Sequence, residues 1–279
     1  MRIGNLAGRA VVVTDEGAID IHAASGGQFG PGLRAIYDDW DAIVDWIRSG
    51  VGEAEPYDPA LLRSPSPEPR QVFGIGLNYR AHADESEMPH PTFPPTFTKF
   101  PSSITGPNDV VSLPSDNVDF EVELVVVIGR YSHRVLATEA WQHVAGVCIG
   151  QDLSERVVQM KPPLPQFSLG KSFPGFAPMG PWVVSVDELD DPDDLPLSCH
   201  VNGELMQESR SSDLIFSVPH LFEILTAITP FMPGDVIFTG TPQGVGQSRS
   251  PQRFLRPDDV VVSRLGTLCE MTTRFTAGP

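Results

Sequence analysis

The sequence predicts a mainly β fold of the α+β class, in which a small α+β segment precedes a larger strand-rich domain. The 279 residues include 25 glycines and 28 prolines, which are too many helix breakers for a helical bundle. Short apolar runs recur between turn residues, and the dipeptide Asn202-Gly203 between two such runs is a strong hairpin signal. Few segments have the apolar spacing of a helix.

The first 68 residues are expected to form a small N-terminal domain and a linker. A short strand is predicted over residues 10–13, and a helix over residues 37–49. The helix is predicted because four apolar residues recur at i, i+3, i+4 and i+7, namely Trp40, Ile43, Val44 and Ile47. The proline-rich segment 63–69 is typical of a stiff, extended connector, so we place the domain boundary near residue 68.

The remainder, residues 69–279, is predicted to be one strand-rich domain. Strands are predicted over residues 72–75, 96–100, 110–113, 120–128, 144–149, 197–201, 204–207, 236–239, 260–265 and 268–275. Helices are predicted over residues 153–160 and 218–228, with Ser217 as a candidate N-cap of the second. The acidic segment 187–195 is predicted to be a solvated loop.

The charge and the cysteine content exclude several classes of function. The chain has 36 acidic and 19 basic residues, so its formal net charge is -17, and this charge repels nucleic acids and anionic membranes. Cys148, Cys199 and Cys269 are widely spaced and lie near no histidine cluster, so neither a disulfide framework nor a zinc site is expected. The sequence has no long apolar run, so we expect a cytoplasmic protein without a signal peptide or membrane span.

The segment 119–128 carries the sharpest chemical signal. Side chains alternate along a strand, so Glu121 and Glu123 lie on one face with their Cα atoms about 6–7 Å apart. These carboxylates repel each other unless a cation lies between them, and a hard divalent cation such as Mg²⁺, Mn²⁺ or Ca²⁺ suits such ligands. A half-exposed strand with both acids in water would have the same spacing.

A third carboxylate, Asp152, follows the predicted strand 144–149, and strand ends commonly carry functional groups. On the predicted helix after it, Asp152, Arg156 and Gln159 share a face that suits an anionic, oxygen-rich ligand. An N-cap role for Asp152, or a solvated Asp–Arg pair, would give the same pattern. Lys171 lies in a loop between proline segments, and taken alone it is equally compatible with an ordinary surface charge.

His82 and Glu85 are three residues apart, so they touch if this segment forms a helical turn. A His–Glu pair can act as a general base toward water, with the carboxylate orienting the imidazole, although such pairs are also common as surface contacts. The proline-rich segment 86–95 that follows is a candidate mobile lid.

From about Phe73 to its end, the chain resembles the fumarylacetoacetate hydrolase superfamily. The matching segments are GLNYRAHADE, FTKFPSSITGP, DFEVELVVVIGR, GQDLSERVVQ, LGKSFPGFAPMGPWVV, VNGELMQESRSSDLIFSVPHL and PGDVIFTGTPQGVG, and they occur in the order and at the spacing of the family. The resemblance implies a mixed β-sheet roll or sandwich, often assembled as a homodimer. The segment 1–69 is similar to the variable N-terminal domain of longer members.

The resemblance also assigns roles to residues. It implies a Mg²⁺ or Mn²⁺ ion held by Glu121, Glu123 and Asp152, and an α-keto acid substrate that chelates this ion. It implies that His82 and Glu85 form a catalytic dyad. The residues that it places around the substrate are Tyr79, Arg156, Gln159, Lys171 and Thr241.

The expected reaction is hydrolysis of a C–C bond in an acylpyruvate, which yields pyruvate and a carboxylic acid. His82 and Glu85 would deprotonate the attacking water, and Lys171 with the metal would stabilise the departing pyruvate enolate. The same machinery leaves oxaloacetate decarboxylation, hydration of a 2-keto-4-enoate and keto-acid tautomerisation open. A metal-binding homologue without turnover is the non-enzyme alternative, and the dyad and Lys171 argue against it.

Overall fold

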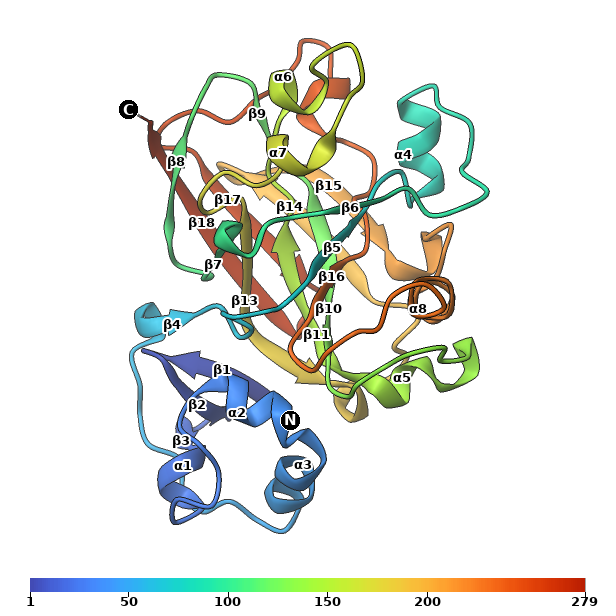
Figure 1. Cartoon of the computed structure of the whole chain (residues 1–279). Helices are drawn as coiled ribbons and strands as arrows, with labels where there is room; N and C mark the ends of the chain where they lie inside the picture. The colour runs from blue at the N-terminus through green and yellow to red at the C-terminus, as the bar shows by residue number, and fades with distance from the viewer. Residues whose placement is uncertain (279) are drawn as a thin grey trace.

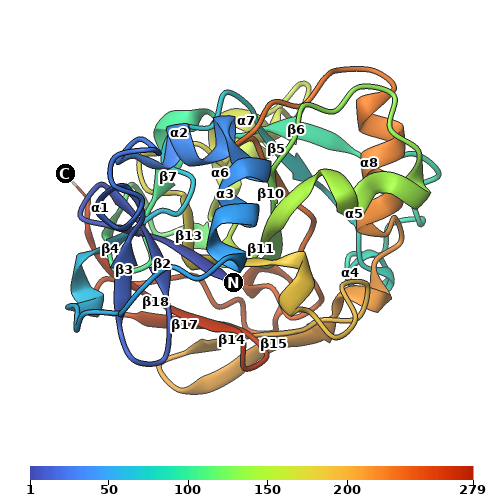
Figure 2. The same cartoon turned by 90° about the horizontal axis from the view of Figure 1, so that it is seen from below.

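The computed structural model describes residues 1–278 and consists of two facing β-sheets with short helices around them (Figures 1 and 2). The large sheet has the strand order β3-β2-β1-β13-β11-β10-β16-β5-β6, with β4 beside β1 and β7 beside β13. Its strands are β1 (Arg2–Leu6), β2 (Arg9–Val13), β3 (Ala18–Asp20), β4 (Leu62–Arg63), β5 (Val72–Ile75), β6 (Thr96–Thr98), β7 (Ile104–Thr105), β10 (Val122–Ile128), β11 (Val144–Gln151), β13 (Ala177–Ser185) and β16 (Val236–Phe238).

The small sheet has the order β15-β14-β17-β18-β8, and β9 pairs with β12 apart from both sheets. These strands are β8 (Val110–Leu113), β9 (Val118–Asp119), β12 (Ser154–Glu155), β14 (Pro196–Val201), β15 (Glu204–Arg210), β17 (Val260–Leu265) and β18 (Cys269–Ala277). The helices are α1 (Ile21–Ala24), α2 (Leu33–Asp38), α3 (Trp40–Arg48), α4 (Arg80–Glu85), α5 (Ala140–His143), α6 (Arg156–Gln159), α7 (Phe167–Gly170) and α8 (Val218–Thr226). None of the described helices has the length and apolar character that crossing a membrane requires.

Strand β10 shows why the two sheets pack face to face. Every residue of this strand is buried, so both of its faces are covered. Val122, Leu124 and Val126 point into the core that β10 shares with strands of the small sheet. Val125 and Val127 point the other way, into a second core with residues of α2 and α3. The mainly β architecture predicted from the sequence is therefore confirmed.

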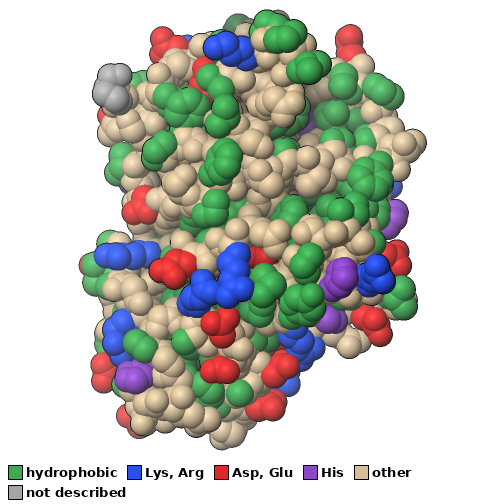
Figure 3. Space-filling view, in the orientation of Figure 1, with side chains coloured by type: hydrophobic (Ala, Val, Ile, Leu, Met, Phe, Trp, Pro, Cys, Tyr) green, Lys and Arg blue, Asp and Glu red, His purple; other side chains and the backbone are tan. Residues whose placement is uncertain are grey.

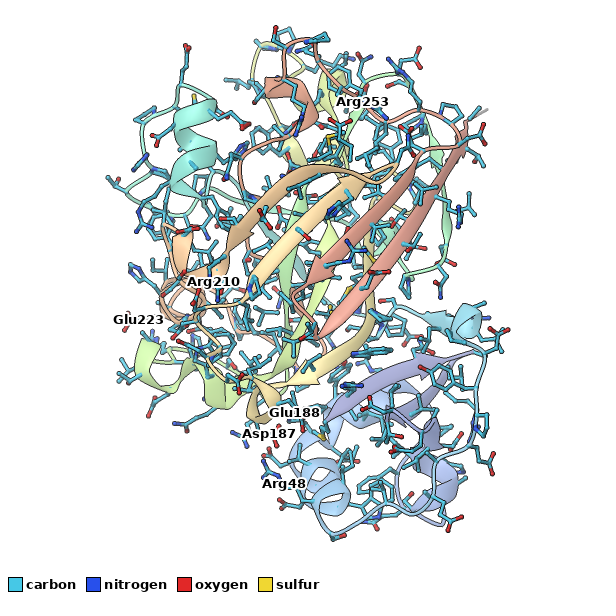
Figure 4. All side chains as sticks on the ribbon, turned by 180° about the vertical axis from the view of Figure 1, so that it is seen from behind. Arg48, Asp187, Glu188, Arg210, Glu223 and Arg253 are labelled. Atoms are coloured by element: carbon cyan, nitrogen blue, oxygen red, sulfur yellow. The ribbon has the colours of Figure 1, made fainter. Side chains whose placement is uncertain are left out.

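The N-terminal segment extends the large sheet across the proposed domain boundary. Strand β1 pairs antiparallel with β13, with Ile3 opposite Val183. Arg48, the last residue of α3, is exposed and forms an ion pair of 3.1 Å with Asp187. Figure 4 labels both residues. The boundary near residue 68 stays a prediction about which parts fold independently, because one sheet spans both sides of it.

Two predicted helices are wrong in extent. The helix expected over residues 37–49 is divided at Asp39, which ends α2 and begins α3. Of the helix expected over residues 153–160, only α6 forms, because residues 154–155 pair with β9 instead. Glu155 caps α6, accepting a hydrogen bond from the N–H of Val158, so Asp152 is not the N-cap. Ser217 precedes α8 as expected but makes no side-chain capping hydrogen bond.

The acidic segment 187–195 is a loop, as predicted, apart from a 3-10 turn over Val186–Glu188 at its start, and it is partly anchored. Glu188 forms an ion pair of 2.9 Å with the N-terminal amine, and Arg210 binds Asp194 at 2.6 Å. Figure 4 labels Glu188 and Arg210, and neither lines the cavity described below. The acids therefore hold surface segments together and contribute nothing to the site described below.

Candidate active site

Three carboxylates converge at one end of the large sheet. Glu123 lies in β10, Glu121 immediately precedes that strand, and Asp152 immediately follows β11. The two strands are antiparallel with Val122 opposite Gln151, so the start of one lies beside the end of the other. One oxygen from each carboxylate lies within 4.8 Å of the other two, and all three residues are buried.

Two buried lysines bind these carboxylates from different sides. The Nζ of Lys171 donates to Oε2 of Glu121 at 2.7 Å, to Oδ2 of Asp152 at 2.6 Å and to the hydroxyl of Ser154 at 2.8 Å. The Nζ of Lys99 donates to Oδ1 of Asp152 at 2.5 Å and to the backbone carbonyl of Lys171. Each oxygen of Asp152 therefore has its own ammonium donor.

Arg156 extends the charged cluster toward the neighbouring loop. Its guanidinium donates to Oδ2 of Asp119 at 2.7 and 2.9 Å, and it lies 2.7 Å from Oε1 of Glu121. It also donates to the side-chain carbonyl of Gln159 at 2.9 Å. Asp119 in turn accepts the backbone N–H of Gly246 at 2.7 Å, so this acid fixes both Arg156 and the loop after β16.

The two glutamates of the cluster have opposite electrostatic environments. Burial alone would raise the pKa of Glu121, but Lys171 and Arg156 outweigh burial and lower this pKa to about 2. Burial raises the pKa of Glu123 well above its usual value, and repulsion from Asp152 and Glu121 raises it further. Glu123 accepts a backbone N–H from Gly240 at 2.8 Å but has no ion-pair partner in the described chain.

His82 and Glu85 lie on α4, where the predicted helical turn forms. The Nδ1 of His82 is 3.7 Å from Oε1 of Glu85, and neither atom has a hydrogen-bond partner within the described residues. The other oxygen of Glu85 accepts the backbone N–H of Gly244 at 2.5 Å. Burial would raise the pKa of Glu85, but His82 and Gly244 outweigh it, so this pKa is lowered and the carboxylate is ionised near neutral pH.

A cavity of about 400 Å³ opens onto the carboxylates. Predicted site residues account for its charged inner end, namely His82, Glu121, Glu123, Asp152, Arg156, Gln159, Lys171 and Thr241. The hydroxyl of Thr241 donates to the carbonyl of Val122 at 3.0 Å, so the threonine is anchored to the start of β10. Glu85 does not line the cavity itself and reaches it through His82.

A larger cavity of about 640 Å³ lies between α3 and the β11–β13 side of the body. Its two arginines are already paired, Arg48 with Asp187 and Arg130 with Asp41. It also lacks a group of converging carboxylates, cysteines or histidines, since the described residues contain only the cluster at Asp152. The smaller cavity is therefore the candidate active site.

Among the predicted site residues Tyr79 does not line the cavity, and two residues of the charged cluster were missed. Tyr79 is fully buried in the core between the sheets and does not line the cavity, so its assignment to substrate binding stays a prediction. Lys99 and Asp119 were not predicted as site residues. The sequence signal for Lys99 is the rarity of lysine, which accounts for three of the 19 basic residues. The structure adds that two of these three lysines are buried at Asp152.

The donor set fits a hard divalent cation. The three carboxylates converge on one point, and their mutual repulsion is the kind of strain that a bound cation relieves. Carboxylate oxygens are the ligands that Mg²⁺ and Mn²⁺ prefer, whereas the cluster offers no sulfur or imidazole ligand for a softer metal.

Comparison with known proteins gives consistent matches. The sequence profile of the family described as fumarylacetoacetate (FAA) hydrolase, C-terminal, matches residues 71–276. The human mitochondrial oxaloacetate tautomerase FAHD2A is 41% identical over 218 residues, which cover 76% of this chain and 69% of that protein. The crystal structure of a putative HpcE protein from Mycobacterium smegmatis is 49% identical, with a TM-score of 0.95 and full coverage of both chains. Maleylpyruvate hydrolase from Sphingobium sp. SYK-6, solved with manganese(II) and pyruvate, is 26% identical, with a TM-score of 0.83 and full coverage of both chains.

Proposed function

The chain belongs to the fumarylacetoacetate hydrolase family, and from this premise we propose that it is a divalent-metal-dependent hydrolase of acylpyruvates. In an acylpyruvate, one methylene carbon lies between the two carbonyl groups. The reaction cleaves the bond between this methylene carbon and the distal carbonyl carbon. Water supplies hydroxyl to the distal acyl group and a proton to the methylene carbon, so the products are a carboxylic acid and pyruvate.

The observation that carries this proposal is the meeting of the His82–Glu85 pair with Lys171 and the carboxylates in one cavity. Hydrolysis needs a base that deprotonates water and a group that stabilises the negative charge of the leaving enolate. His82 suits the first task and the buried Lys171 suits the second. A protein that only binds a metal needs neither.

A divalent ion held by Glu121, Glu123 and Asp152 would supply Lewis-acid stabilisation of developing negative charge. The protein's own groups perform the remaining steps. His82 Nδ1 faces Glu85 at 3.7 Å, so the ionised carboxylate can stabilise the imidazolium that forms when the other ring nitrogen accepts a proton from water. The protonated His82 then returns this proton to the methylene carbon of the departing enolate.

Arg156, Gln159 and Thr241 suit the orientation of the substrate's oxygen atoms. Gln159 is 96% buried and accepts a hydrogen bond from Arg156, which leaves its amide N–H₂ free to donate. Asp119 holds Arg156 in place and therefore positions this pair without lining the cavity itself. Fixed donors at the inner end favour a single orientation of the substrate.

Tautomerisation of oxaloacetate is the second candidate, and the curated relatives favour it. The human protein and several other relatives that are named oxaloacetate tautomerases are 39–41% identical to this chain. That reaction needs the same stabilisation of an enolate but no attack by water. The site residues suit both reactions, so the substrates must be compared directly.

The test measures both reactions on the full chain with Mg²⁺ or Mn²⁺. Loss of the enol absorbance of acylpyruvates, with formation of pyruvate, reports hydrolysis, whereas the keto–enol equilibration rate of oxaloacetate reports tautomerisation. We expect hydrolysis, and we expect His82→Ala to reduce kcat by about 10²–10⁴-fold. The matched control is His90→Ala, because His90 is an exposed histidine of the neighbouring segment that pairs with Asp84.

Equal losses in both reactions for His82→Ala would count against its water-activating role. If no acylpyruvate is cleaved while oxaloacetate equilibrates faster, the second candidate replaces the first. If neither substrate reacts, the chain is a binding homologue. The homodimer expected from the resemblance and the cytoplasmic location are part of this proposal as well, and sedimentation velocity checks the first of them.

A further inference from the structure

The cavity is divided into a charged inner end and an uncharged outer part. All charged or ionisable groups among the lining residues belong to the inner end around Asp152. The outer part is lined by apolar and neutral polar side chains, namely Ile75, Leu77, Ser86, Met88, Phe97, Met160, Phe167, Val245, Gln247, Ser248 and Gln252. The inner end suits a keto acid head group, and the outer part must then receive the substrate's tail.

The cations nearest in sequence to this outer wall are held away from it. Arg249 follows Ser248, but its guanidinium donates to the carbonyls of Gly244 at 3.0 Å and Met206 at 2.6 Å. Arg253, which is labelled in Figure 4, follows Gln252, and it forms an ion pair of 2.8 Å with Asp259. Neither arginine lines the cavity, and Lys161, which follows Met160, does not line it either.

The two cations that do line the cavity are held at its inner end, where their charge acts on the head group and not on the tail. The Lys171 ammonium donates to Glu121, Asp152 and Ser154. Arg156 is held by Asp119 and Glu121 at the inner end. A carboxylate in the outer part would therefore lose water without gaining an ion pair, which is unfavourable. The formal net charge of -17 adds repulsion instead of attraction.

Two methionines of the outer part are also exposed to solvent. Met88 and Met160 are each 49% exposed, and Leu164 and Leu169 nearby on the α6–α7 segment are more exposed still. Hydrophobic side chains gather on the upper part of the face that Figure 3 shows, over α4 and over α6 and α7. An apolar tail would gain favourable contacts here because it leaves water for apolar surface.

From this division we infer that the site selects acylpyruvates whose tail is apolar and carries no charge, an inference that rests on the proposed hydrolase function. Specificity then depends on the outer wall, where Gln247, Ser248 and Gln252 offer neutral hydrogen bonds in place of an ion pair. Oxaloacetate, the substrate of the second candidate reaction, does not contradict this inference. Only one methylene separates its second carboxylate from the keto carbon, so this carboxylate would lie at the charged inner end and not in the outer part.

The test compares two substrates that differ only in the end of the tail. Butanoylpyruvate has a propyl tail, and succinylpyruvate has a tail of the same length that ends in a carboxylate. We expect kcat/KM of the Mn²⁺-loaded full chain to be at least about tenfold higher for butanoylpyruvate. An equal or higher kcat/KM for succinylpyruvate overturns the inference.

A charge variant tests whether the outer wall is responsible. Gln252→Lys places an ammonium at this wall, so we expect it to raise the succinylpyruvate-to-butanoylpyruvate ratio of kcat/KM by about tenfold. The matched control is Gln28→Lys, which adds the same charge at an exposed glutamine that lines none of the described cavities near the site. An equal change of the ratio in both variants would assign the effect to net charge and overturn the role of the wall.

A binding measurement separates this inference from the proposed reaction. α-Ketohexanoate and α-ketoadipate form the same matched pair, but they lack the second carbonyl and cannot be hydrolysed. Calorimetric titration of the Mn²⁺-loaded protein should give at least about tenfold tighter binding for α-ketohexanoate. If this preference is observed and no acylpyruvate is cleaved, the hydrolase proposal fails and the inferred tail specificity stands. Equal or tighter binding of α-ketoadipate overturns the inference whatever the turnover.

Discussion

Replacing Lys99 with methionine tests whether the carboxylate cluster depends on a cation that never faces the substrate. Lys99 is 1% exposed and donates to Oδ1 of Asp152 and to the carbonyl of Lys171. Methionine has a similar length and no charge, so the substitution removes the ammonium while leaving little empty space. It leaves a buried carboxylate oxygen and a buried carbonyl without their donor.

Removing one partner of a buried ion pair typically costs about 3–5 kcal/mol of unfolding free energy. Two features of the site favour the lower end of this range. Asp152 keeps the ammonium of Lys171 at 2.6 Å, so its charge is not left uncompensated. Burial also lowers the pKa of Lys99 despite the nearby Asp152, which means that the charged lysine is itself costly to bury. We therefore expect a loss of about 3 kcal/mol.

Urea unfolding measures this loss, and the control is Lys161→Met at the exposed lysine. With an m-value of about 3 kcal/mol/M, Lys99→Met should lower the unfolding midpoint by about 1 M, and the control should change stability by at most about 0.5 kcal/mol. A double-mutant cycle with Asp152→Asn should give a coupling of about 1–3 kcal/mol. If Lys99→Met behaves like the control, or if the cycle shows no coupling, Lys99 does not support the cluster.

Other predictions address individual residues of the site. Glu123→Gln should abolish binding of Mn²⁺ as measured by electron paramagnetic resonance, and a variant that keeps wild-type affinity contradicts the metal assignment. The pKa of Glu121 is about 2 in the folded protein against an ordinary value of 4.5, so its ionised form stabilises the fold above pH 4.5 and this contribution disappears as the pH falls toward 2. Urea unfolding of Glu121→Gln should accordingly lose less stability than the wild type between pH 5 and about 3, and parallel losses would refute this. Tyr79→Phe should leave kcat/KM and stability nearly unchanged, because the buried Tyr79 hydroxyl has no described partner and does not line the cavity; a tenfold loss of kcat/KM would restore its substrate role.

Strands were easier to predict from this sequence than helices. The strands over residues 72–75, 110–113 and 260–265 form as predicted, because apolar runs bounded by turn residues are local signals. The helix expected over residues 153–160 forms only over Arg156–Gln159, because a contact with a distant part of the chain replaces its start. Residues 154–155 pair with Val118 and Asp119, a partner 35 residues earlier that no local period can reveal. The long strand β13 was not predicted, because its run contains a glycine and two prolines.

The acids of the site could be predicted, but their partners could not. Period two along the predicted strand 120–128 placed Glu121 and Glu123 on one face, and the burial of alternate residues of β10 in opposite cores agrees with that alternation. The contact of Lys99 with Asp152 joins residues 53 positions apart, and that of Arg156 with Asp119 joins residues 37 apart. The sequence suggested instead that Asp152, Arg156 and Gln159 share one face of a helix, with an Asp152–Arg156 pair as the alternative, and both interpretations required the longer helix.

The charge of the site differs in kind from the charge of the whole chain. The chain carries a net charge of -17, which gives no long-range attraction for an anionic keto acid. At the inner end, however, Asp119, Glu121, Glu123 and Asp152 face Lys99, Lys171 and Arg156, so four carboxylates meet three cations. One divalent cation among them would turn this small negative balance positive, which is enough to attract one carboxylate at short range. No positive charge would then remain for a second carboxylate in the outer part of the cavity. The net charge of the inner end and the uncharged outer wall therefore both favour an acylpyruvate with an uncharged tail.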